Sequence, residues 1–319
     1  MKPQVLLTGG LGYVGGRVAR HLATASGYTL KLGARRVTAA PSWLKDGAVV
    51  HMDVLDEASL EAACRGVTHI VHFAALNEID SASDPEQALV VNGLGSLKLL
   101  RAAIRAGVQR FVYFSTAHVY GAPLVGVLTE DTLPRPQHPY AITHRTAEDF
   151  VLAAHDRKEI TGLVTRLSNG FGAPERPEVN RWTLLANDLC RQAVVDRKLV
   201  LKSSGLQSRD FITLEDVARA VHHLLDLPRE ACDNGLFNLG GENAMRIIDV
   251  AERIADRCEA VLGFRPEIQR PQPAPGETTP PLEYRMDKLK GTGFVLQSNI
   301  DAELDATLRL CQEAFAAGS

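Results

Sequence analysis

The chain has 319 residues, of which 45% are hydrophobic, and its formal net charge is -3 at pH 7. This length and composition allow a full core, so we expect one large α/β unit with a smaller appended lobe. A charge so close to zero gives no strongly basic face, which argues against nucleic acid as a partner.

The chain shows no signal for a membrane or an export pathway. No apolar run approaches the roughly 18 residues that a membrane span needs, and Met1-Lys2-Pro3 leads directly into an apolar run without room for a signal peptide. We therefore expect a cytoplasmic protein with small-molecule ligands and no membrane partner.

The cysteines and histidines predict neither disulfides nor a metal site. The cysteines are odd in number, scattered and without Cys-x-x-Cys spacing, so we expect reduced structural thiols. His222 and His223 are adjacent on a predicted helix and point in different directions, so no metal site is expected.

Short apolar runs alternate with helix-like stretches along the first half of the chain. This alternation is typical of a Rossmann-type, doubly wound parallel sheet. The expected strands are 5–7, 29–32, 48–52, 69–73, 111–114 and 163–167. Amphipathic spacing predicts helices at 94–104 and 146–154, and a further helix is expected at 182–193.

A glycine triplet follows directly on the first apolar run. Gly9, Gly12 and Gly15 would let a strand turn sharply into a helix and leave backbone N–H groups available to a pyrophosphate. We expect a dinucleotide site here, with Tyr13 and Val14 beside the glycines. The alternative is an ordinary glycine-rich turn.

The order of elements suggests two parts. After Gly172 the regular pattern loosens, and a proline-rich stretch covers 266–281. We expect residues 1–168 and 209–240 to form the dinucleotide-binding domain. Residues 169–208 and 241–319 would form a substrate-binding lobe.

The end of the second expected strand bears on the choice of nicotinamide cofactor. An acidic residue there would favour NAD, but the chain has Arg35 and Arg36, whose guanidinium groups can bind a 2′-phosphate. We therefore expect NADP in preference to NAD. If these arginines are only solvated loop charges, NAD stays open.

The loop after the third expected strand is predicted to hold the adenine. Asp53 is placed to accept a hydrogen bond from the adenine amino group, with Val54 beside it. In the alternative interpretation, Asp56 caps the next helix and Asp53 only lies in the loop.

Several short segments between residue 5 and about residue 240 form a recognisable combination. They are Thr8 to Gly15, His72-Phe73-Ala74-Ala75, Asn92, Phe114 to Gly121, Tyr140 to His144, Arg166 to Asn169 and Arg209 to Ile212. Together these segments resemble the extended short-chain dehydrogenase/reductases, and more narrowly their NAD-dependent, nucleotide-sugar epimerase/dehydratase branch.

The resemblance implies roles for residues around the reacting centre. Tyr140 would carry the proton of the substrate hydroxyl, and Thr116 would hydrogen-bond the substrate oxygen. The implied cofactor contacts in this part of the chain are Phe73, Ala74, Ala75, Asn92, Tyr140 and His144.

The chain departs from the family at His144. A tyrosine phenol has a pKa near 10, and the family lowers it with a lysine one helical turn later, which also holds the nicotinamide ribose. This chain has histidine at that position. A histidinium could still lower the tyrosine pKa, His144 could relay the proton, or the protein could have lost redox turnover and only bind its ligand.

A second departure concerns dehydration. Relatives that dehydrate a 4-keto sugar carry an acidic pair directly after the strand-end threonine, whereas this chain has Ala117 and His118. A 4,6-dehydratase is therefore not expected. His118 is predicted to contact substrate, and a structural histidine is the alternative.

The resemblance also implies a grip on the diphosphate of a nucleotide sugar. Arg209 and Asn169 match residues of that pocket, and Asn77 is expected to face the sugar unless it belongs to a solvated loop. A further arginine of the C-terminal lobe is replaced by the segment 274–277, so Arg270 or Arg285 would have to substitute for it.

These observations favour an NAD(P)-dependent oxidoreductase or epimerase that transfers hydride at a ring carbinol or ketone of a nucleotide-activated sugar, as a 4-epimerase or a ketoreductase. The alternatives are a catalytically weakened dinucleotide-binding protein and a reductase of a non-nucleotide ketone. The resemblance implies a homodimer formed through the helices that follow Asn92 and Tyr140.

Overall fold

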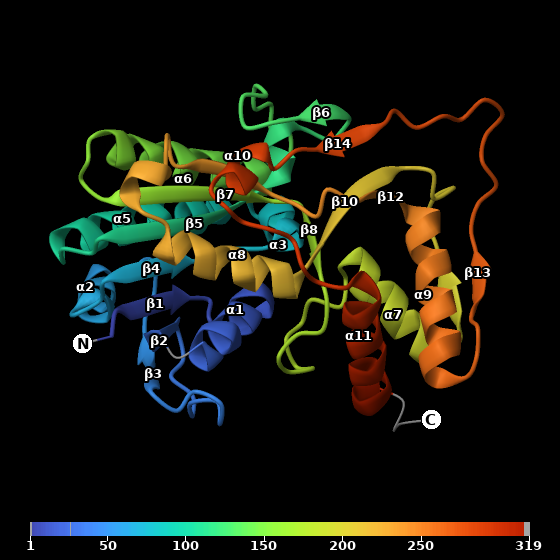
Figure 1. Cartoon of the computed structure of the whole chain (residues 1–319), viewed down its shortest axis with the longest axis horizontal. Helices are drawn as coiled ribbons and strands as arrows, with labels where there is room; N and C mark the ends of the chain where they lie inside the picture. Colours follow the sequence, from blue (N-terminus) through green and yellow to red (C-terminus); the bar gives the residue numbers. More distant parts are fainter. Residues whose placement is uncertain (1, 26, 316–319) are drawn as a thin grey trace.

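The computed structural model describes residues 2–25 and 27–315, and within them seven parallel strands form one central sheet (Figure 1). These strands are β1 (Gln4–Thr8), β2 (Thr29–Ala34), β3 (Gly47–His51), β4 (His69–His72), β5 (Arg110–Thr116), β7 (Thr161–Leu167) and β11 (Leu236–Leu239). Their order is β11-β7-β5-β4-β1-β2-β3. The expected doubly wound α/β sheet is confirmed, and β11 is a strand that the sequence pattern did not predict.

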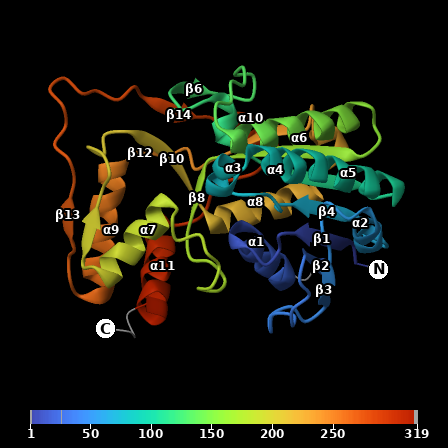
Figure 2. The same ribbon diagram turned by 180° about the vertical axis from the view of Figure 1, so that it is seen from behind.

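The sheet is buried on both faces because successive side chains of each strand point to opposite sides. On β1, Val5 and Leu7 belong to one core and Leu6 to the other. The first core packs against α1 (Tyr13–Thr24) and α8 (Leu214–Asp226), and the second against α2 (Glu57–Cys64), α5 (Ser96–Arg105) and α6 (Pro139–Asp156). Figure 2 shows α5 and α6 on the face opposite to α8.

The segment from β4 to α5 is more irregular than its apolar spacing suggests. It contains α3 (Glu78–Ser83), α4 (Pro85–Ala88) and the π-helix η1 (Leu89–Gly95). The helix expected at 94–104 therefore begins as a π-helix. Asn92 lies at the centre of the π-helix η1 and is fully buried. Its side chain forms hydrogen bonds with Leu76 and Thr143, which lie outside η1.

Short elements connect the larger ones. They are the 3-10 helices η2 (Ala117–Tyr120) and η3 (Arg229–Ala231), and the strand β6 (Gly126–Leu128), which pairs with β14 (Leu282–Tyr284).

A separate hydrophobic core, here called the lobe, is formed by α7 (Leu185–Val195), α9 (Ile247–Leu262) and α11 (Ile300–Phe315). Beside these helices lie a three-stranded sheet of β8 (Asn169–Phe171), β10 (Ser208–Thr213) and β12 (Ala244–Arg246), and a pair of β9 (Lys198–Val200) and β13 (Glu267–Gln269). Between β14 and α11, the chain passes through α10 (Asp287–Gly291). In and beside this short helix, Met286, Leu289 and Phe294 join the core that packs against α8. Residues 1, 26 and 316–319 of the expected domain ranges lie outside the described residues.

The helix expected at 182–193 begins three residues later, at Leu185. Trp182 lies in the preceding loop, where its indole N–H donates to the carbonyl oxygen of Pro177. This indole bond helps to fix the loop that leads into α7.

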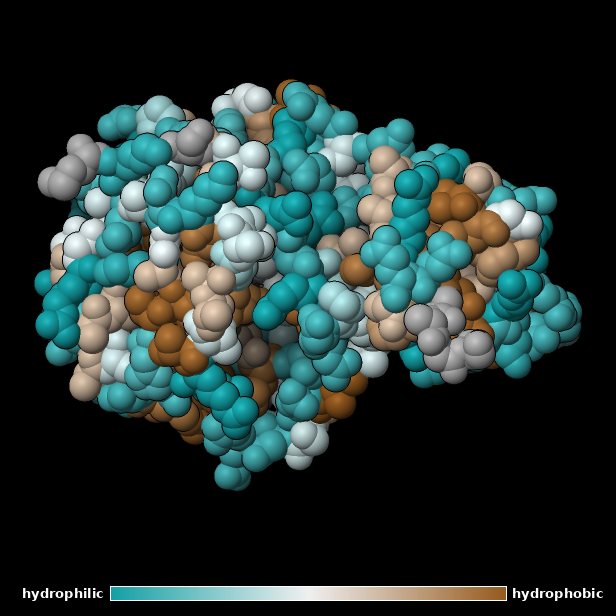
Figure 3. All heavy atoms as spheres, turned by 90° about the horizontal axis from the view of Figure 1, so that it is seen from below, coloured by the Kyte–Doolittle hydropathy of each residue, from teal (hydrophilic) through white to brown (hydrophobic). Residues whose placement is uncertain are grey.

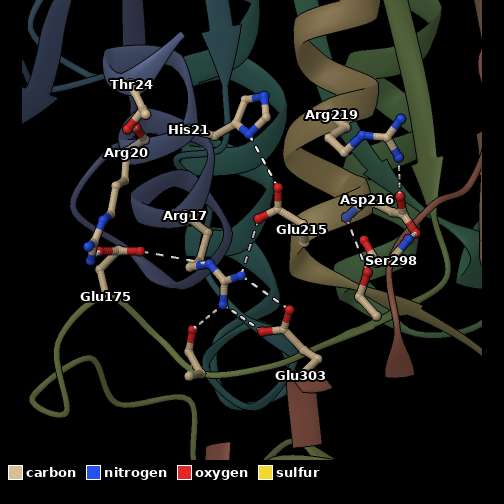
Figure 4. A network of polar contacts seen from close by, with 12 residues as sticks. Arg17, Arg20, His21, Thr24, Glu175, Glu215, Asp216, Arg219, Ser298 and Glu303 are labelled. Carbon is tan, nitrogen blue, oxygen red and sulfur yellow. Dashed lines mark hydrogen bonds and ion pairs between the residues drawn. The ribbon is translucent and has the colours of Figure 1, made fainter. Parts of the chain in front are cut away.

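Arg17 on α1 joins the sheet domain to the lobe (Figure 4). Its Nη1 lies 2.6 Å from Oε1 of Glu303 on α11 and donates to the carbonyl oxygen of Ala173 at 2.9 Å. Glu175 and Glu215 lie 3.7 and 3.6 Å from the same guanidinium. The helix that follows the glycine loop is thus fixed to the lobe.

The described helices include none that is both long and apolar enough to cross a membrane. Figure 3 shows one face of the molecule, where hydrophilic side chains predominate and hydrophobic ones form separate patches.

A buried ion pair joins α6 to β7. The side chains of Glu148 and Arg166 are both fully buried, and the guanidinium bonds the carboxylate through Nε and Nη2, the latter at 2.7 Å. Ser115 on β5 donates its hydroxyl to the same carboxylate, and the Tyr120 ring lies 4.7 Å from the guanidinium carbon. One carboxylate therefore connects α6 to two strands of the sheet.

We expect Arg166→Met to lower the free energy of unfolding by about 3 kcal/mol, because it leaves the buried Glu148 carboxylate with only the partly exposed Arg145, 3.1 Å away, as a cation. The double variant Glu148→Leu/Arg166→Met should lose less free energy of unfolding than Arg166→Met, since no unpaired charge remains buried between α6 and β7. Urea unfolding followed by circular dichroism measures both.

The matched control is Arg157→Met, which removes an exposed arginine paired with Glu159 and should change stability little. Equal losses in the single and double variants would contradict the assigned role of the buried charge.

Candidate active site

The glycine loop forms a tight cradle at the carboxyl end of β1. Gly9 has a φ of +66°, which favours glycine, and a Cβ on Gly15 would lie 2.3 Å from the Gly9 carbonyl oxygen. Gly12 is the N-cap of α1, and in the described part of the chain no side chain caps this helix. The first N–H groups of α1 and its dipole therefore favour an anion.

A cavity of about 370 Å³, here called the glycine-loop cavity, opens beside this turn. Its lining includes the predicted residues Gly9, Gly12, Tyr13, Val14, Gly15, Phe73, Ala74, Ala75, Tyr140 and His144. Thr8 fixes the opposite wall, because its hydroxyl oxygen accepts from the N–H groups of Phe73 and Ala74. The cradle and the cavity fit the pyrophosphate and nicotinamide portion of a dinucleotide.

A second cavity, of about 290 Å³ and here called the Arg209 cavity, adjoins the first. Thr116, His118, Asn169 and Arg209 line it, as the sequence predicts for a substrate pocket. The two cavities share the lining residues Tyr13, Val14, Ser115, Tyr140, Leu167 and Arg181. Tyr140 therefore lies where a ligand of one cavity meets a ligand of the other.

His144 packs directly on Tyr140. The two ring centroids are 4.1 Å apart, and His144 Nδ1 lies 2.9 Å from the carbonyl oxygen of Tyr140. A carbonyl oxygen can only accept, so Nδ1 carries the proton of the neutral ring. Nε2 is then the unprotonated nitrogen.

The environment of His144 favours the neutral imidazole. Its side chain is 2% exposed, and burial lowers its pKa to about 4, although the bond to the Tyr140 carbonyl opposes this shift. Burial therefore argues against the histidinium that the sequence left open as one of three alternatives. Desolvation of the ring, which the sequence did not reveal, is the physical reason.

Burial has the opposite effect on Tyr140, because its charged form is the phenolate. Burial raises the pKa of Tyr140 to about 12, and Glu78 acts in the same direction, whereas Arg181 lowers it. Arg181 lies in the loop between β8 and α7 and belongs to no motif in the sequence. Sequence reasoning missed it, and the available signal was a single arginine in the loop that follows Pro174 and Pro177.

The side chains that line the Arg209 cavity are held by different hydrogen-bond partners. Asn169 donates its side-chain amide to the carbonyl oxygen of Asp210, which fixes it beside β10. Thr116 ends β5 and accepts from the N–H of His118. Burial and the nearby Arg209 lower the pKa of His118, which favours its neutral form.

Two residues that were predicted to contact a ligand have structural roles. Asn77 has such a role in addition to its place at a cavity, and Asn92 has one instead. Asn77 lines the glycine-loop cavity, but its side-chain oxygen caps α3 by accepting from the N–H groups of Ile79 and Asp80. Asn92 lines neither cavity. Its side chain is turned toward Leu76 and Thr143, so it positions the loop after β4 instead of reaching a cofactor.

The residues predicted for the adenosine end lie beyond both cavities. Arg35 and Arg36 follow β2 and are both exposed. Asp53 accepts from the N–H of Leu55, while Asp56 caps α2 by accepting from the N–H of Ala58. The expected capping role of Asp56 is therefore confirmed. Val54 contacts the helix at Gly95.

The arginines that could have completed a diphosphate grip do not line the Arg209 cavity. Arg270 donates to the carbonyl oxygen of Ser204, and Arg285 pairs with Asp287 at 2.5 Å. The expectation that either one replaces the missing arginine is not supported, because each is held by a partner elsewhere. Within residues 2–25 and 27–315, no three His, Cys, Asp or Glu side chains gather to hold a metal ion.

Comparison with known proteins places the whole chain among related sequences. Residues 5–240 match the family described as "NAD dependent epimerase/dehydratase family". The dTDP-glucose 4,6-dehydratase of Streptomyces niveus is 27% identical over 81% of this chain and 78% of the relative. The UDP-glucose 4-epimerase of Rhizobium meliloti is 28% identical over 79% of this chain and 82% of the relative.

Among solved structures, the UDP-glucose 4-epimerase of Thermus thermophilus in complex with NAD has a similar fold. Its TM-score is 0.80 at 25% identity, and the match covers 98% of this chain and 99% of that structure.

We expect the His144 imidazole to remain neutral between about pH 5.5 and 8, with the proton on Nδ1. The unfolded chain binds this proton near pH 6.5 but the folded protein only near pH 4, so this residue lowers stability as the pH falls between these values. Nitrogen-15 NMR of the imidazoles, with His144→Gln to assign the signal, measures the pKa. A midpoint at or above about 7.5 would show that the ring is mostly charged near neutral pH and would contradict this expectation.

Proposed function

The chain belongs to the NAD dependent epimerase/dehydratase family, as its motifs predict, and from this premise we propose that it is an NAD(P)-dependent enzyme acting on a nucleotide-activated sugar. The reaction would be hydride transfer at a ring carbinol or ketone, either as a 4-epimerase or as a ketoreductase.

One observation carries the proposal: Tyr140 and Ser115 lie at the junction of the two cavities, with the glycine cradle on one side and Arg209 on the other. Hydride transfer needs the cofactor and the substrate side by side with a proton carrier between them. The division into a dinucleotide-binding domain and a substrate lobe belongs to the same proposal.

The residues present fit the cofactor, because a Cβ at Gly15 would overlap the Gly9 carbonyl and the uncapped α1 terminus suits a pyrophosphate. Gly12, Tyr13 and Val14 would hold it there. When bound, the nicotinamide supplies the hydride acceptor and donor.

Tyr140 would take the substrate hydroxyl proton onto its phenolate oxygen as the carbinol becomes a ketone, and return it in the reverse step. Thr116 would donate a hydrogen bond to the same substrate oxygen. His144 would keep the Tyr140 ring in place through their contact and through its bond to the Tyr140 carbonyl.

The substrate side supports a phosphate-bearing ligand. Arg209 lines the second cavity and matches the arginine implied for a diphosphate grip, and Asn169 lies beside it. Ala117 and His118 supply no carboxyl group after Thr116, so the proposal excludes a 4,6-dehydratase although dehydratases are among the relatives.

A second candidate function has its own support. The neutral, buried His144 places no positive charge beside Tyr140 on the same helix. This arrangement favours a protein that binds the dinucleotide but turns over substrate weakly. Arg270 and Arg285, held away from the Arg209 cavity, leave a reductase of a non-nucleotide ketone as a further alternative.

For the cofactor we propose NADP in preference to NAD. Arg35 and Arg36 lie directly after β2, where a ribose 2′-phosphate would lie, and no acidic residue follows them there. We also propose a cytoplasmic location, which the free, buried state of the five cysteines supports.

A homodimer is proposed from the outer face of η1 and α6. These two elements pack side by side, and they expose Leu89, Leu94, Ile142 and Phe150 by 41% or more each. Such a row of apolar side chains on neighbouring helices suits a contact with a second copy of the same face.

The proposed function predicts that purified protein, denatured and analysed by mass spectrometry, releases NAD(H) or NADP(H). Stoichiometric release favours the epimerase, which keeps its cofactor, and an empty protein that binds NADP in titration favours the reductase. Failure to bind either dinucleotide would overturn the redox proposal.

Tyr140→Phe should then reduce turnover of UDP-glucose or dTDP-glucose by about 10²–10⁴-fold. Tyr28→Phe is the control, since Tyr28 bonds Asp226 away from both cavities.

We expect size-exclusion chromatography with light scattering to give a dimer, and Phe150→Glu to convert it to a monomer by burying a charge in the contact. Val295→Glu, at an exposed valine outside η1 and α6, should leave the dimer intact. A monomeric unmutated protein would disprove this interface.

A further inference from the structure

The helix that carries Tyr140 supplies it with no positive charge. His144 is neutral and buried, and its Nδ1–H is used by the Tyr140 carbonyl. A buried phenol loses its proton more readily when a nearby positive charge offsets part of the lost solvation. Here such a charge has to come from another element.

Arg181 is the cation in position to act. It lies between β8 and α7, where its backbone N–H donates to the Val179 carbonyl oxygen at 2.8 Å. Its side chain lines both cavities beside Tyr140 and is 24% exposed, so water screens its charge only in part. Its Nη2 lies 3.0 Å from a carboxylate oxygen of Glu78, at the start of α3.

We propose that Arg181 replaces, from a loop of the lobe, the cation that position 144 lacks, and that its guanidinium favours the phenolate form of Tyr140. Glu78 holds Arg181 in place and at the same time offsets part of its charge. The proposal rests on the proposed function, in which Tyr140 carries the proton. It makes Arg181 and Glu78 positioning residues whose effect on the reaction passes through Tyr140.

The directions of the pKa shifts agree with this geometry. In the described part of the chain, Arg181 and Glu78 are the charged side chains that move the Tyr140 pKa, down and up respectively. The other titratable groups near the junction come from different elements. They are His144 on α6, Tyr113 on β5, Tyr13 on α1, His118 on η2, His138 before α6 and Arg209 on β10.

Several of these neighbours are neutral near pH 7. Burial lowers the pKa of His144 and His118, and it raises the pKa of Tyr13 and Tyr113. These four groups therefore add no cation. Arg209 is charged but is not among the groups that shift the Tyr140 pKa.

The first experiment measures kcat/KM of the cofactor-loaded enzyme against pH for oxidation of the sugar carbinol. Since the phenolate is the active form, activity rises with pH through the Tyr140 pKa. Arg181→Gln should move this midpoint up by about one pH unit or more, and Glu78→Gln should move it down. Arg181→Lys should keep the midpoint near that of the unmutated enzyme.

Position 144 provides a rescue test. His144→Lys in the Arg181→Gln background should bring the midpoint back down, because a lysine one turn after Tyr140 restores a cation. Arg191→Gln is the matched control, since it removes an arginine paired with Asp188 on α7, outside both cavities. A change in KM at every pH without a shift of the midpoint in Arg181→Gln would overturn the proposal and leave Arg181 as a substrate contact.

A second readout needs no turnover. Carbon-13 NMR of the tyrosine Cζ atoms, with Tyr140→Phe to assign the signal, follows ionisation of Tyr140 in the protein without substrate. In the Glu78→Gln variant, Tyr140 should ionise at a lower pH than in the unmutated protein. In the double variant Glu78→Gln/Arg181→Gln, this shift should disappear. If the enzyme proves inactive but this pattern holds, the proposed function fails while the role of Arg181 stands; an unchanged Tyr140 titration in Glu78→Gln overturns that role.

Discussion

The buried ion pair of Glu148 and Arg166 is the interaction on which the site depends. It joins α6 to β7 without contact with water, and Ser115 of β5 donates to the same carboxylate. Such a pair gives little net stability, since desolvation of both charges offsets their attraction, but either charge alone would be costly. It therefore acts mainly as a constraint on geometry: α6 can take only the position that satisfies Arg166. Because Tyr140 lies two turns before Glu148 on that helix, the same constraint fixes the phenol at the junction of the cavities.

A comparable constraint fixes the lobe. The Tyr13 hydroxyl donates to the Gly172 carbonyl and bonds Asn187 on α7, and Arg17, one turn later, pairs with Glu303 on α11. Both residues belong to α1, which begins in the glycine loop. The position of the Arg209 cavity is thus set relative to the glycine loop by one helix. A loop of the lobe can then bring Arg181 close to Tyr140, although the two residues are far apart in the sequence.

Burial decides the chemistry of this junction more than the identity of any single side chain. The same exclusion of water that lowers the pKa of His144 raises that of Tyr140, because one group is charged when protonated and the other when deprotonated. A histidine in place of lysine at position 144 therefore removes the positive charge, because the buried imidazole is neutral near pH 7. A positive charge beside Tyr140 then has to come from another part of the fold, and Arg181 is the side chain whose charge lowers the Tyr140 pKa.

The sequence by itself determined the fold class, the family and many of the residues that line the cavities. Alternation of apolar runs, the spacing of Gly9, Gly12 and Gly15, and the step from Tyr140 to position 144 are local patterns, and local patterns can be read without coordinates. The sequence could not give the charge state of His144, the role of Asn92 inside the π-helix or the place of Arg181. Each of these depends on which distant elements exclude water from a group or approach it. Desolvation and long-range contact are properties of packing, so only the tertiary structure decided them.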